Sequence, residues 1–250
     1  MIIETDEDLA KLQKIGRICA LTLQEMLAAV RAGMTTKELD EMGGKILARY
    51  GATSAPMAVY DFPGYTCISI NNEIAHGIPG DRVIKPGDMV NIDVSAELDG
   101  YFGDNGATML VGSGDRMGQR LLKASKEALA NAITAAVADR PLNHIGRAIE
   151  NTAHRHGLKL IRNLCGHGVG HTLHDEPEMI DNYYDPRDKR RLAEGLVIAI
   201  EPFISEQENM VMQSKRDGWT LYTPHGTRAA QFEHTIVVTK KRPIILTQAD

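Results

Sequence analysis

Five side chains of metal-ligand type are spread along this 250-residue chain, each inside a short apolar or glycine-rich segment that would hold it in place. They are Asp93, Asp104, His167, Glu201 and Glu233. If they converge, four carboxylates around one neutral imidazole would repel one another unless cations neutralise them or some take up protons. The set therefore predicts a two-metal hydrolytic site. Oxygen-rich ligation with a single nitrogen suits Mn, Fe, Co or Zn, and the absence of thiolates argues against a structural zinc.

The first two carboxylates flank Asp99-Gly100, a strong short-range signal for a β-hairpin. A two-residue turn there would place Asp104 opposite Ser95. Because side chains alternate along a strand, Asp93 would share the face of Ser95 and lie diagonally from Asp104, roughly 7–8 Å away at Cβ. Both carboxylates could then reach adjacent ions. A register slip of one residue would instead turn Asp104 to the other face.

The remaining three ligands come from separate places in the chain. His167 stands in the glycine-rich segment 165–171, where glycines let backbone and ligand approach closely. Glu201 ends one apolar run and Glu233 lies within another, so both are interpreted as strand carboxylates, and acids seldom sit there without a partner. Ordinary structural interpretations also exist. An isolated Asp such as Asp104 is more often a turn or surface residue, and His167 alone could be a hydrogen-bonded core histidine.

The ligands occur within a set of short motifs whose order is more specific than any one of them. These are Asn91-Ile92-Asp93-Val94, Gly166-His167-Gly168-Val169-Gly170, His174-Asp175-Glu176-Pro177, Ile200-Glu201-Pro202 and Gln231-Phe232-Glu233-His234-Thr235. In this combination the chain closely resembles type I methionine aminopeptidase over essentially its whole length. The resemblance implies an α+β protein with the pita-bread fold, a curved antiparallel sheet backed by helices, whose two halves are related by a pseudo-twofold axis.

The resemblance also implies an activity and a role for each ligand. Such an enzyme removes the N-terminal methionine of nascent proteins and peptides when the second residue is small, using water activated by two divalent metal ions. Asp104 and Glu233 would bridge the ions, and Asp93 and Glu233 would each bind one side of the pair. His167 and Glu201 would complete the coordination of the second ion, and Glu201 would also shuttle the proton as general base and acid.

Substrate-binding residues follow from the same resemblance. His174 would hydrogen-bond the developing oxyanion and His76 would contact the scissile amide nitrogen. Without the resemblance, a histidine before Gly or Asp is more simply interpreted as a loop residue facing solvent. The methionine side chain would lie against Phe62, Cys67 and Trp219. Val59 and Leu173 occupy pocket positions that are aromatic in some members, which leaves the shape of the methionine pocket open.

Composition agrees with a soluble globular enzyme and is far less specific. Hydrophobic residues make up 43% and charged residues 24% of the chain. The net charge of −5, without a basic run, gives no nucleic-acid motif, and no apolar stretch is long enough to span a membrane. Three scattered cysteines and a start without signal-like character favour a cytoplasmic protein. We expect a monomer, while ribosome docking, a monovalent-cation site and the native metal stay open.

Local patterns predict the elements that position these residues. Thr5-x-x-Asp8 opens a first helix that closes near Gly33, and Thr35-x-x-Glu38, a capping box, starts a second that stops at Gly51. Further predicted elements are strands at 66–70, 89–97 and 101–111, helices at about 115–138 and 142–156, and strands at 196–201, 219–223, 229–239 and 243–246. The order helix, helix, strands occurs twice, which suggests a duplicated architecture. No linker separates the halves, so we expect residues 1–250 to form a single catalytic metallopeptidase domain.

Three other classes of protein compete with this interpretation. A proline-directed metallopeptidase such as aminopeptidase P or prolidase shares the five ligands but carries an additional N-terminal domain. Chain length therefore distinguishes that class from a type I methionine aminopeptidase. A type II methionine aminopeptidase would have a helical insertion between the last two glutamates, whereas only 31 residues separate Glu201 from Glu233. A non-catalytic binding member of the fold would have lost ligands, and all five are present.

Overall fold

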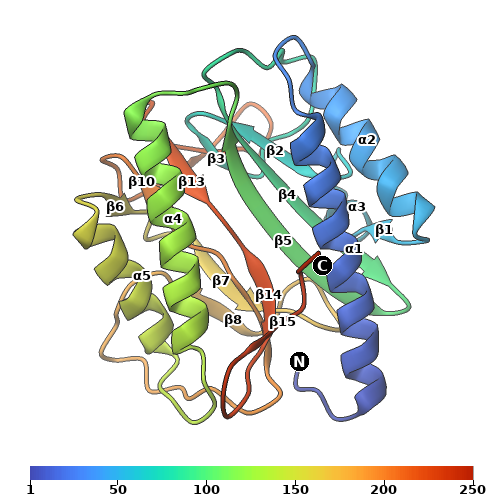
Figure 1. Ribbon diagram of the computed structural model, residues 1–250, viewed down its shortest axis with the longest axis vertical. Helices are drawn as coiled ribbons and strands as arrows, with labels where there is room; N and C mark the ends of the chain where they lie inside the picture. Colours follow the sequence, from blue (N-terminus) through green and yellow to red (C-terminus); the bar gives the residue numbers. More distant parts are fainter. Residues whose placement is uncertain (250) are drawn as a thin grey trace.

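The first half of the chain places two long helices over an antiparallel sheet (Figure 1). The computed structural model describes residues 1–249. The elements of this half are α1 (Asp6–Ala29), α2 (Thr36–Arg49), β1 (Thr53–Ser54), α3 (Ala55–Tyr60), β2 (Cys67–Ile70), β3 (Glu73–Ala75), β4 (Met89–Leu98) and β5 (Tyr101–Leu110). Both predicted helix starts are confirmed, and each of α1 and α2 begins with a capping box. In the sheet, β4 pairs with β1, β2 and β5.

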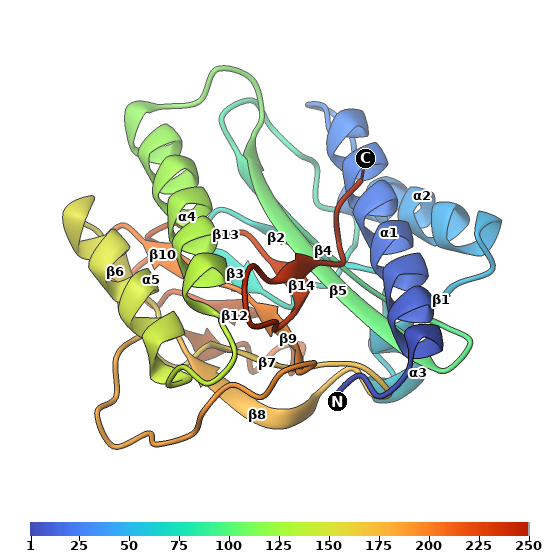
Figure 2. The ribbon, with the colours of Figure 1, turned by 60° about the horizontal axis from the view of Figure 1, so that its bottom comes forward.

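The second half repeats the plan with two helices and shorter strands (Figure 2). Its elements are α4 (Arg116–Ala135), α5 (Asn143–Arg155), β6 (Lys159–Leu160), β7 (Cys165–Gly168), β8 (Asp175–Asp181), β9 (Val197–Ile200), β10 (Phe203–Ser205), β11 (Met212–Gln213), β12 (Leu221–Tyr222), β13 (Ala229–Gln231), β14 (His234–Val237) and β15 (Ile244–Ile245). One sheet has the order β15-β14-β9-β7-β8 and another β13-β10-β6. A third has the order β11-β12-β3, so that β3 of the first half pairs with β12. The predicted repetition of helix, helix and strands is therefore confirmed.

The hairpin of β4 and β5 has the predicted register. Its turn residues, Asp99 and Gly100, both have positive φ angles, of 54° and 82°. A two-residue hairpin turn of type I′ requires positive φ at both positions, and its twist matches that of the flanking strands. Ser95 lies opposite Asp104, as predicted, so Asp93 and Asp104 occupy the same face of the sheet.

The two halves meet where the edge of β5 approaches β13 and β14 (Figure 1). Phe232 forms an isolated bridge with Ala107, and the Glu233 N–H donates to the Gly106 carbonyl over 2.8 Å. Two residues after Glu233, the Thr235 hydroxyl bonds the backbone of Asp104 in β5 in place of a neighbouring strand. It accepts from the Asp104 N–H at 3.0 Å and donates to the Asp104 carbonyl at 2.7 Å.

Several sequence expectations differ from the structure in detail. The strand predicted over 229–239 is two strands, because the chain leaves the β-ladder at Glu233 to bond across the junction. The strand predicted over 219–223 covers only 221–222, since the Asp217 carboxylate accepts the backbone N–H groups of Trp219 and Thr220 and holds them in a turn. The short helix α3 and the strands β1, β3, β6, β7, β8, β10 and β11 were not expected.

The main hydrophobic core lies between the helices and the sheets of both halves. Its fully buried side chains include Leu12 and Ile15 from α1, Ile92 from β4, and Leu121 and Ile145 from α4 and α5. Burying an aliphatic side chain of this size stabilises the fold by about 1.5–3 kcal/mol. Among the described residues, no helix is long and apolar enough to cross a membrane.

Candidate active site

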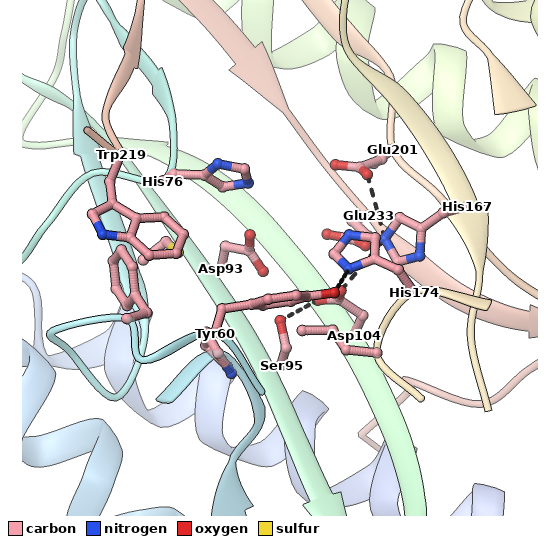
Figure 3. A pocket seen from close by; sticks show the side chains of 14 residues that line it. Tyr60, His76, Asp93, Ser95, Asp104, His167, His174, Glu201, Trp219 and Glu233 are labelled. Carbon is pink, nitrogen blue, oxygen red and sulfur yellow. Dashed lines mark hydrogen bonds and ion pairs between the residues drawn. The ribbon is translucent and has the colours of Figure 1, made fainter. Parts of the chain in front are cut away.

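A cavity of about 240 Å³ opens between the two halves (Figure 3). The ten residues to which the sequence assigned a catalytic, metal-binding or substrate-binding role all line it, namely Phe62, Cys67, His76, Asp93, Asp104, His167, His174, Glu201, Trp219 and Glu233. Four further lining residues are Pro56, Tyr60, Ser95 and Leu173. Residues far apart in the sequence thus meet in one concave space, which is the usual form of a catalytic site.

The β4–β5 hairpin supplies two carboxylates to this cavity. Asp104 is buried, and the Ser95 hydroxyl donates to its Oδ1 over 2.8 Å. Asp93 lies opposite Cys67 in the β2–β4 ladder, so the carboxylate and the thiol share a face. The cross-strand register thereby places a ligand-type residue and a pocket residue side by side.

His167 is oriented by its own strand. Its Nδ1 lies 2.8 Å from the Gly168 carbonyl, to which an Nδ1–H donates. The free Nε2 then lies 3.7 Å from Asp104 Oδ2 and 3.7 Å from Glu201 Oε1. Burial lowers the pKa of His167, so its imidazole is neutral and these contacts are not ion pairs. A neutral imidazole whose other nitrogen is bonded to a carbonyl is the form that binds metal ions.

The sequence suggested that the glycines beside His167 allow close approach of a ligand. In the structure they instead allow neighbouring strands to pack closely. A Cβ added to Gly166 would lie 2.4 Å from the Ala199 carbonyl oxygen. A Cβ added to Gly168 would lie 2.3 Å from the Glu176 carbonyl oxygen. The glycines therefore let β7 fit tightly between β8 and β9, and His167 reaches the cavity from that packed strand.

Glu201 and Glu233 stand at interruptions in strands. Glu201 follows the last residue of β9, and Glu233 occupies the gap between β13 and β14. Glu233 is buried, and Gln231 Nε2 donates to its Oε2 over 2.9 Å. At such points the backbone leaves the ladder, which lets a side chain turn into the cavity.

Asn91 and Gln231 are supporting residues that sequence analysis did not assign. Asn91 Nδ2 donates to Gln231 Oε1 over 2.8 Å, so the Gln231 amide is fixed while it donates to Glu233. A Cβ at Gly106 would lie 2.5 Å from Gln231 Oε1, so glycine leaves the space that this amide fills. A simple pattern could have found both residues. Each is a polar side chain two positions before a ligand, so the alternation of a predicted strand would place it on the side of that ligand.

Electrostatics at the site favour bound cations. Burial raises the pKa of Asp104 to about 6. Burial first, and then repulsion from Asp104, raises the pKa values of Asp93, Glu201 and Glu233 well above their usual range. The buried oxygens Asp93 Oδ1 and Glu233 Oε1 have no hydrogen-bond partner within residues 1–249. Buried acceptors of this kind need a partner, and a divalent cation would satisfy them.

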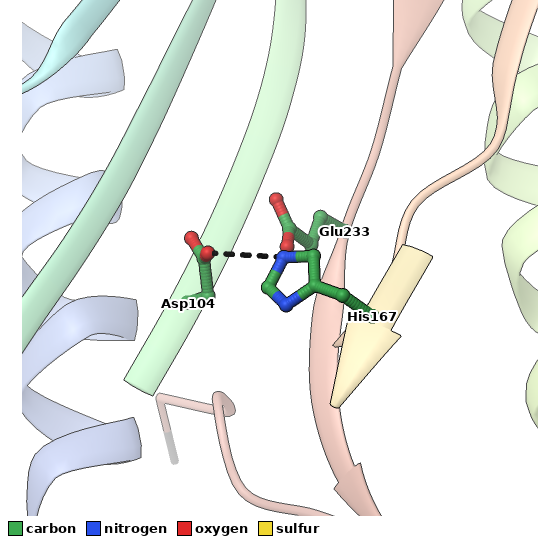
Figure 4. Close-up of side chains that lie close together, drawn as sticks. All are labelled: Asp104, His167 and Glu233. Carbon is green, nitrogen blue, oxygen red and sulfur yellow. Dashed lines mark ion pairs between the residues drawn. The ribbon is translucent and has the colours of Figure 1, made fainter. Parts of the chain in front are cut away.

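One group of ligand atoms is already close enough to hold a metal ion (Figure 4). Atoms of Asp104, His167 and Glu233 all lie within 4.8 Å of one another, and all three residues are buried. Carboxylate oxygens with one imidazole nitrogen suit divalent ions of the first transition series. The donor set therefore fits a divalent metal.

Two histidines line the cavity without belonging to this group. Desolvation by the surrounding protein lowers the pKa of His76 to about 4, with a smaller contribution from His174. The pKa of His174 is also lowered to about 4, first by desolvation and then by repulsion from His167. Both rings are therefore neutral near pH 7 and can donate or accept a hydrogen bond without carrying charge.

The apolar end of the cavity is built from aromatic rings. Phe62 meets Trp219 edge to face, with ring centroids 5.3 Å apart and an interplanar angle of 89°. Leu173 is buried and lines the cavity, as expected. Val59 was expected to occupy a pocket position, but it does not line the cavity and its side chain is 43% exposed. The lining residue from this part of α3 is its neighbour Tyr60, because adjacent positions of a helix face different directions.

Comparison with known proteins identifies the family. Residues 10–240 match metallopeptidase family M24. The chain is 46% identical to methionine aminopeptidase 2 of Bacillus subtilis, over 99% of this chain and 100% of that protein. The crystal structure of methionine aminopeptidase from Rickettsia prowazekii superposes with a TM-score of 0.94 and 36% identity, covering 99% and 100% of the two chains. Prolidase from Pyrococcus furiosus, at 23% identity, shares the fold with a TM-score of 0.78, and the chain covers 66% of it.

These likenesses confirm the pita-bread fold expected from the sequence. The chain belongs to metallopeptidase family M24 and is, within it, a methionine aminopeptidase, a metal-dependent enzyme that removes N-terminal methionine.

Proposed function

We propose that this enzyme removes methionine when the second residue is small, and that it uses two divalent ions. The proposed metal ligands are Asp93, Asp104, His167, Glu201 and Glu233. The observation that carries the proposal is the convergence of four carboxylates and one neutral imidazole on a cavity where two buried oxygens have no partner in the described chain. Because both halves supply ligands, we propose that residues 1–250 act as one catalytic domain.

Charge supports two ions. Asp104 and Glu233 are buried, while Asp93 and Glu201 are partly open to the cavity. One divalent cation would balance only two of the four carboxylates, and the other two would stay charged at a high cost in a partly desolvated site or take up protons. Two divalent cations would balance all four. Mn, Fe, Co and Zn all accept this donor set, so the choice among them rests with experiment.

The side chains of this cavity can carry the proton transfers of peptide hydrolysis. Divalent ions, when bound, supply Lewis acidity, which makes hydroxide available near neutral pH and polarises the scissile carbonyl. Glu201 would accept a proton from the attacking water and deliver it to the leaving amine. Neutral His174 would donate a hydrogen bond to the developing oxyanion, and His76 would contact the scissile amide nitrogen.

The shape of the cavity supports the proposed specificity. Phe62, Cys67 and Trp219 offer an apolar surface suited to a flexible thioether. Once methionine fills this surface, the wall beyond the scissile bond would leave little space for a large second side chain. Steric exclusion would then select small second residues.

We further propose that the enzyme acts in the cytoplasm on nascent chains as a monomer. Its three cysteines, Cys19, Cys67 and Cys165, are all free thiols. Unpaired cysteines fit a reducing compartment, where newly made proteins first expose their N-terminal methionine.

A peptide assay with controlled metal content tests the proposal. Metal-free protein is reloaded with each ion in turn under anaerobic conditions, and turnover of Met-Ala-Ser, Met-Leu-Ser and Ala-Pro is measured alongside calorimetric metal stoichiometry. We expect two ions bound per chain and turnover of Met-Ala-Ser alone. Equal turnover of Met-Leu-Ser would refute the small-residue rule, full activity with one ion would refute the dinuclear site, and turnover of Ala-Pro would favour a proline-directed peptidase.

The role of His174 has its own test. The variant His174→Ala is expected to lower kcat by about 10²–10³-fold, the usual effect of losing one oxyanion donor. Its metal stoichiometry should be unchanged. Loss of metal in this variant would instead identify His174 as a ligand.

A further inference from the structure

Tyr60 makes the closest polar contact to a proposed catalytic histidine. It is the last residue of α3, and its ring extends across the cavity to the opposite wall (Figure 3). Its hydroxyl oxygen lies 2.7 Å from His174 Nδ1. The ring centroids of Tyr60 and His174 lie 5.6 Å apart, and the rings are tilted by 55°. The His174 ring also contacts the ring of His167, with centroids 4.2 Å apart. His174 therefore stands between a tyrosine and a proposed metal ligand.

The short helix that carries Tyr60 is fixed at both ends. At its start, the Ser54 hydroxyl accepts from the Met57 N–H and donates to the Tyr65 carbonyl over 2.8 Å. At its end, Asp61 has the left-handed conformation, with φ 56°, and the Phe62 N–H bonds back to the Pro56 carbonyl. This closure is the common way to end a helix abruptly. It holds Tyr60 at the cavity wall independently of His174.

We propose that Tyr60 is a positioning residue for the aminopeptidase reaction, whose hydroxyl donates to His174 Nδ1 and thereby keeps the imidazole proton on Nε2. The inference deepens the proposed function and rests on the role proposed there for His174. A neutral imidazole has one donor nitrogen and one acceptor nitrogen. If Tyr60 occupies Nδ1 as a donor, Nε2–H is the group left to donate to substrate.

The chemistry of the two groups favours this direction for the hydrogen bond. An unprotonated imidazole nitrogen is a much stronger base than a phenol oxygen, so the phenol donates. Desolvation raises the pKa of Tyr60, so its phenol keeps its proton near pH 7 and is available to donate. Both side chains are also accessible from the cavity, where water can replace a lost partner. The effect of Tyr60 on rate should therefore be moderate.

The tautomer of His174 can be observed directly. Zinc-loaded enzyme labelled with ¹⁵N-histidine is compared by two-bond ¹H–¹⁵N correlation spectra for wild type, Tyr60→Phe and Tyr65→Phe, with His174 assigned from His174→Ala. Tyr65 is the matched control, a partly exposed tyrosine that lines a neighbouring hollow and not this cavity. We expect protonated Nε2 in wild type and Tyr65→Phe, and a mixture of tautomers in Tyr60→Phe. Protonated Nδ1 in wild type, or an unchanged pattern in Tyr60→Phe, would overturn the proposal.

Kinetics then link the tautomer to the reaction. On Met-Ala-Ser, Tyr60→Phe should lower kcat by about three- to ten-fold, the size of one lost neutral hydrogen bond, with KM and metal content unchanged. In a His174→Ala background the same change should have no further effect, because Tyr60 acts through His174. An equal loss in both backgrounds would refute this route of action. Wild-type turnover by His174→Ala would refute the proposed function of His174 instead, and the spectra would still report on the hydrogen bond.

Discussion

Replacing Thr235 with valine is expected to destabilise the protein at the junction between its halves. Asp104 faces Ser95 on one side of β5, but its backbone N–H and C=O bond on the other side to the Thr235 hydroxyl, at 3.0 and 2.7 Å. Thr235 is fully buried and Asp104 is 5% exposed. Water therefore has little access to either backbone group once the hydroxyl is removed.

The size of the effect follows from the two groups left without partners. Each buried backbone group that loses its hydrogen bond costs about 1–3 kcal/mol, so the free energy of unfolding should fall by about 2–6 kcal/mol. In a chain of this length about 1 kcal/mol corresponds to 2–4 °C, so Tm should fall by on the order of 10 °C. Because Asp104 is also a proposed ligand, metal affinity should weaken by about 10–100-fold.

Thermal melts at one scan rate and calorimetric metal titration measure both effects. Thr235→Ser keeps the hydroxyl and should retain most of the stability. Thr239→Val is the matched control, because the Thr239 hydroxyl also accepts one backbone N–H and donates to one carbonyl, at 3.1 and 2.8 Å, but in an exposed setting. Its cost should stay within about 0.5 kcal/mol. A Tm for Thr235→Val within about 2 °C of wild type would refute the reasoning.

Three further outcomes are expected. Asp8→Asn should lower Tm at pH 7, because hydrogen bonds, chiefly from Tyr101, lower the pKa of Asp8 to about 2. A lowered folded-state pKa gives stability that is complete above about pH 4 and lost toward pH 2, so the difference in Tm should vanish over that range. Gly168→Ala should prevent native folding, since its Cβ would lie 2.3 Å from a backbone oxygen of β8, whereas Gly80→Ala, with no described atom within 4 Å, should melt like wild type. Glu201→Gln should lower turnover by about 10²–10⁴-fold without lowering the Tm of the metal-free protein, and near-normal kcat with normal metal content would contradict its role.

The parts of the site that could be predicted obey local rules. Asp99-Gly100 determines a two-residue turn, and the alternation of side chains then places Asp93 and Asp104 on one face. The patterns Thr5-x-x-Asp8 and Thr35-x-x-Glu38 similarly located the starts of α1 and α2. In these segments, residues close in sequence decide the geometry.

Contacts between distant segments could not be predicted in this way. The six residues of α3 are too few to show a helical period, so nothing in the sequence indicated that Tyr60 enters the cavity while Val59 stays outside. Alternation suggested one strand through Glu233, but the bond of its N–H to Gly106 interrupts the ladder there. The role of Thr235 depends on Asp104, 131 residues earlier. Single-sequence patterns contain no information at that separation.

The division of the ligands between two halves has a consequence for synthesis of the protein. The β4–β5 hairpin closes through neighbouring residues and can form in microseconds, whereas the contact of Asp104 with the β14 region closes a loop of more than a hundred residues. During translation, at about 5–20 residues per second, many seconds therefore pass between the synthesis of Asp104 and that of Glu233. In that interval the chain has a pair of carboxylates but no complete metal site. Tight metal binding should therefore begin only when β13 and β14 dock against β5. The time course of metal binding would then report when folding is complete.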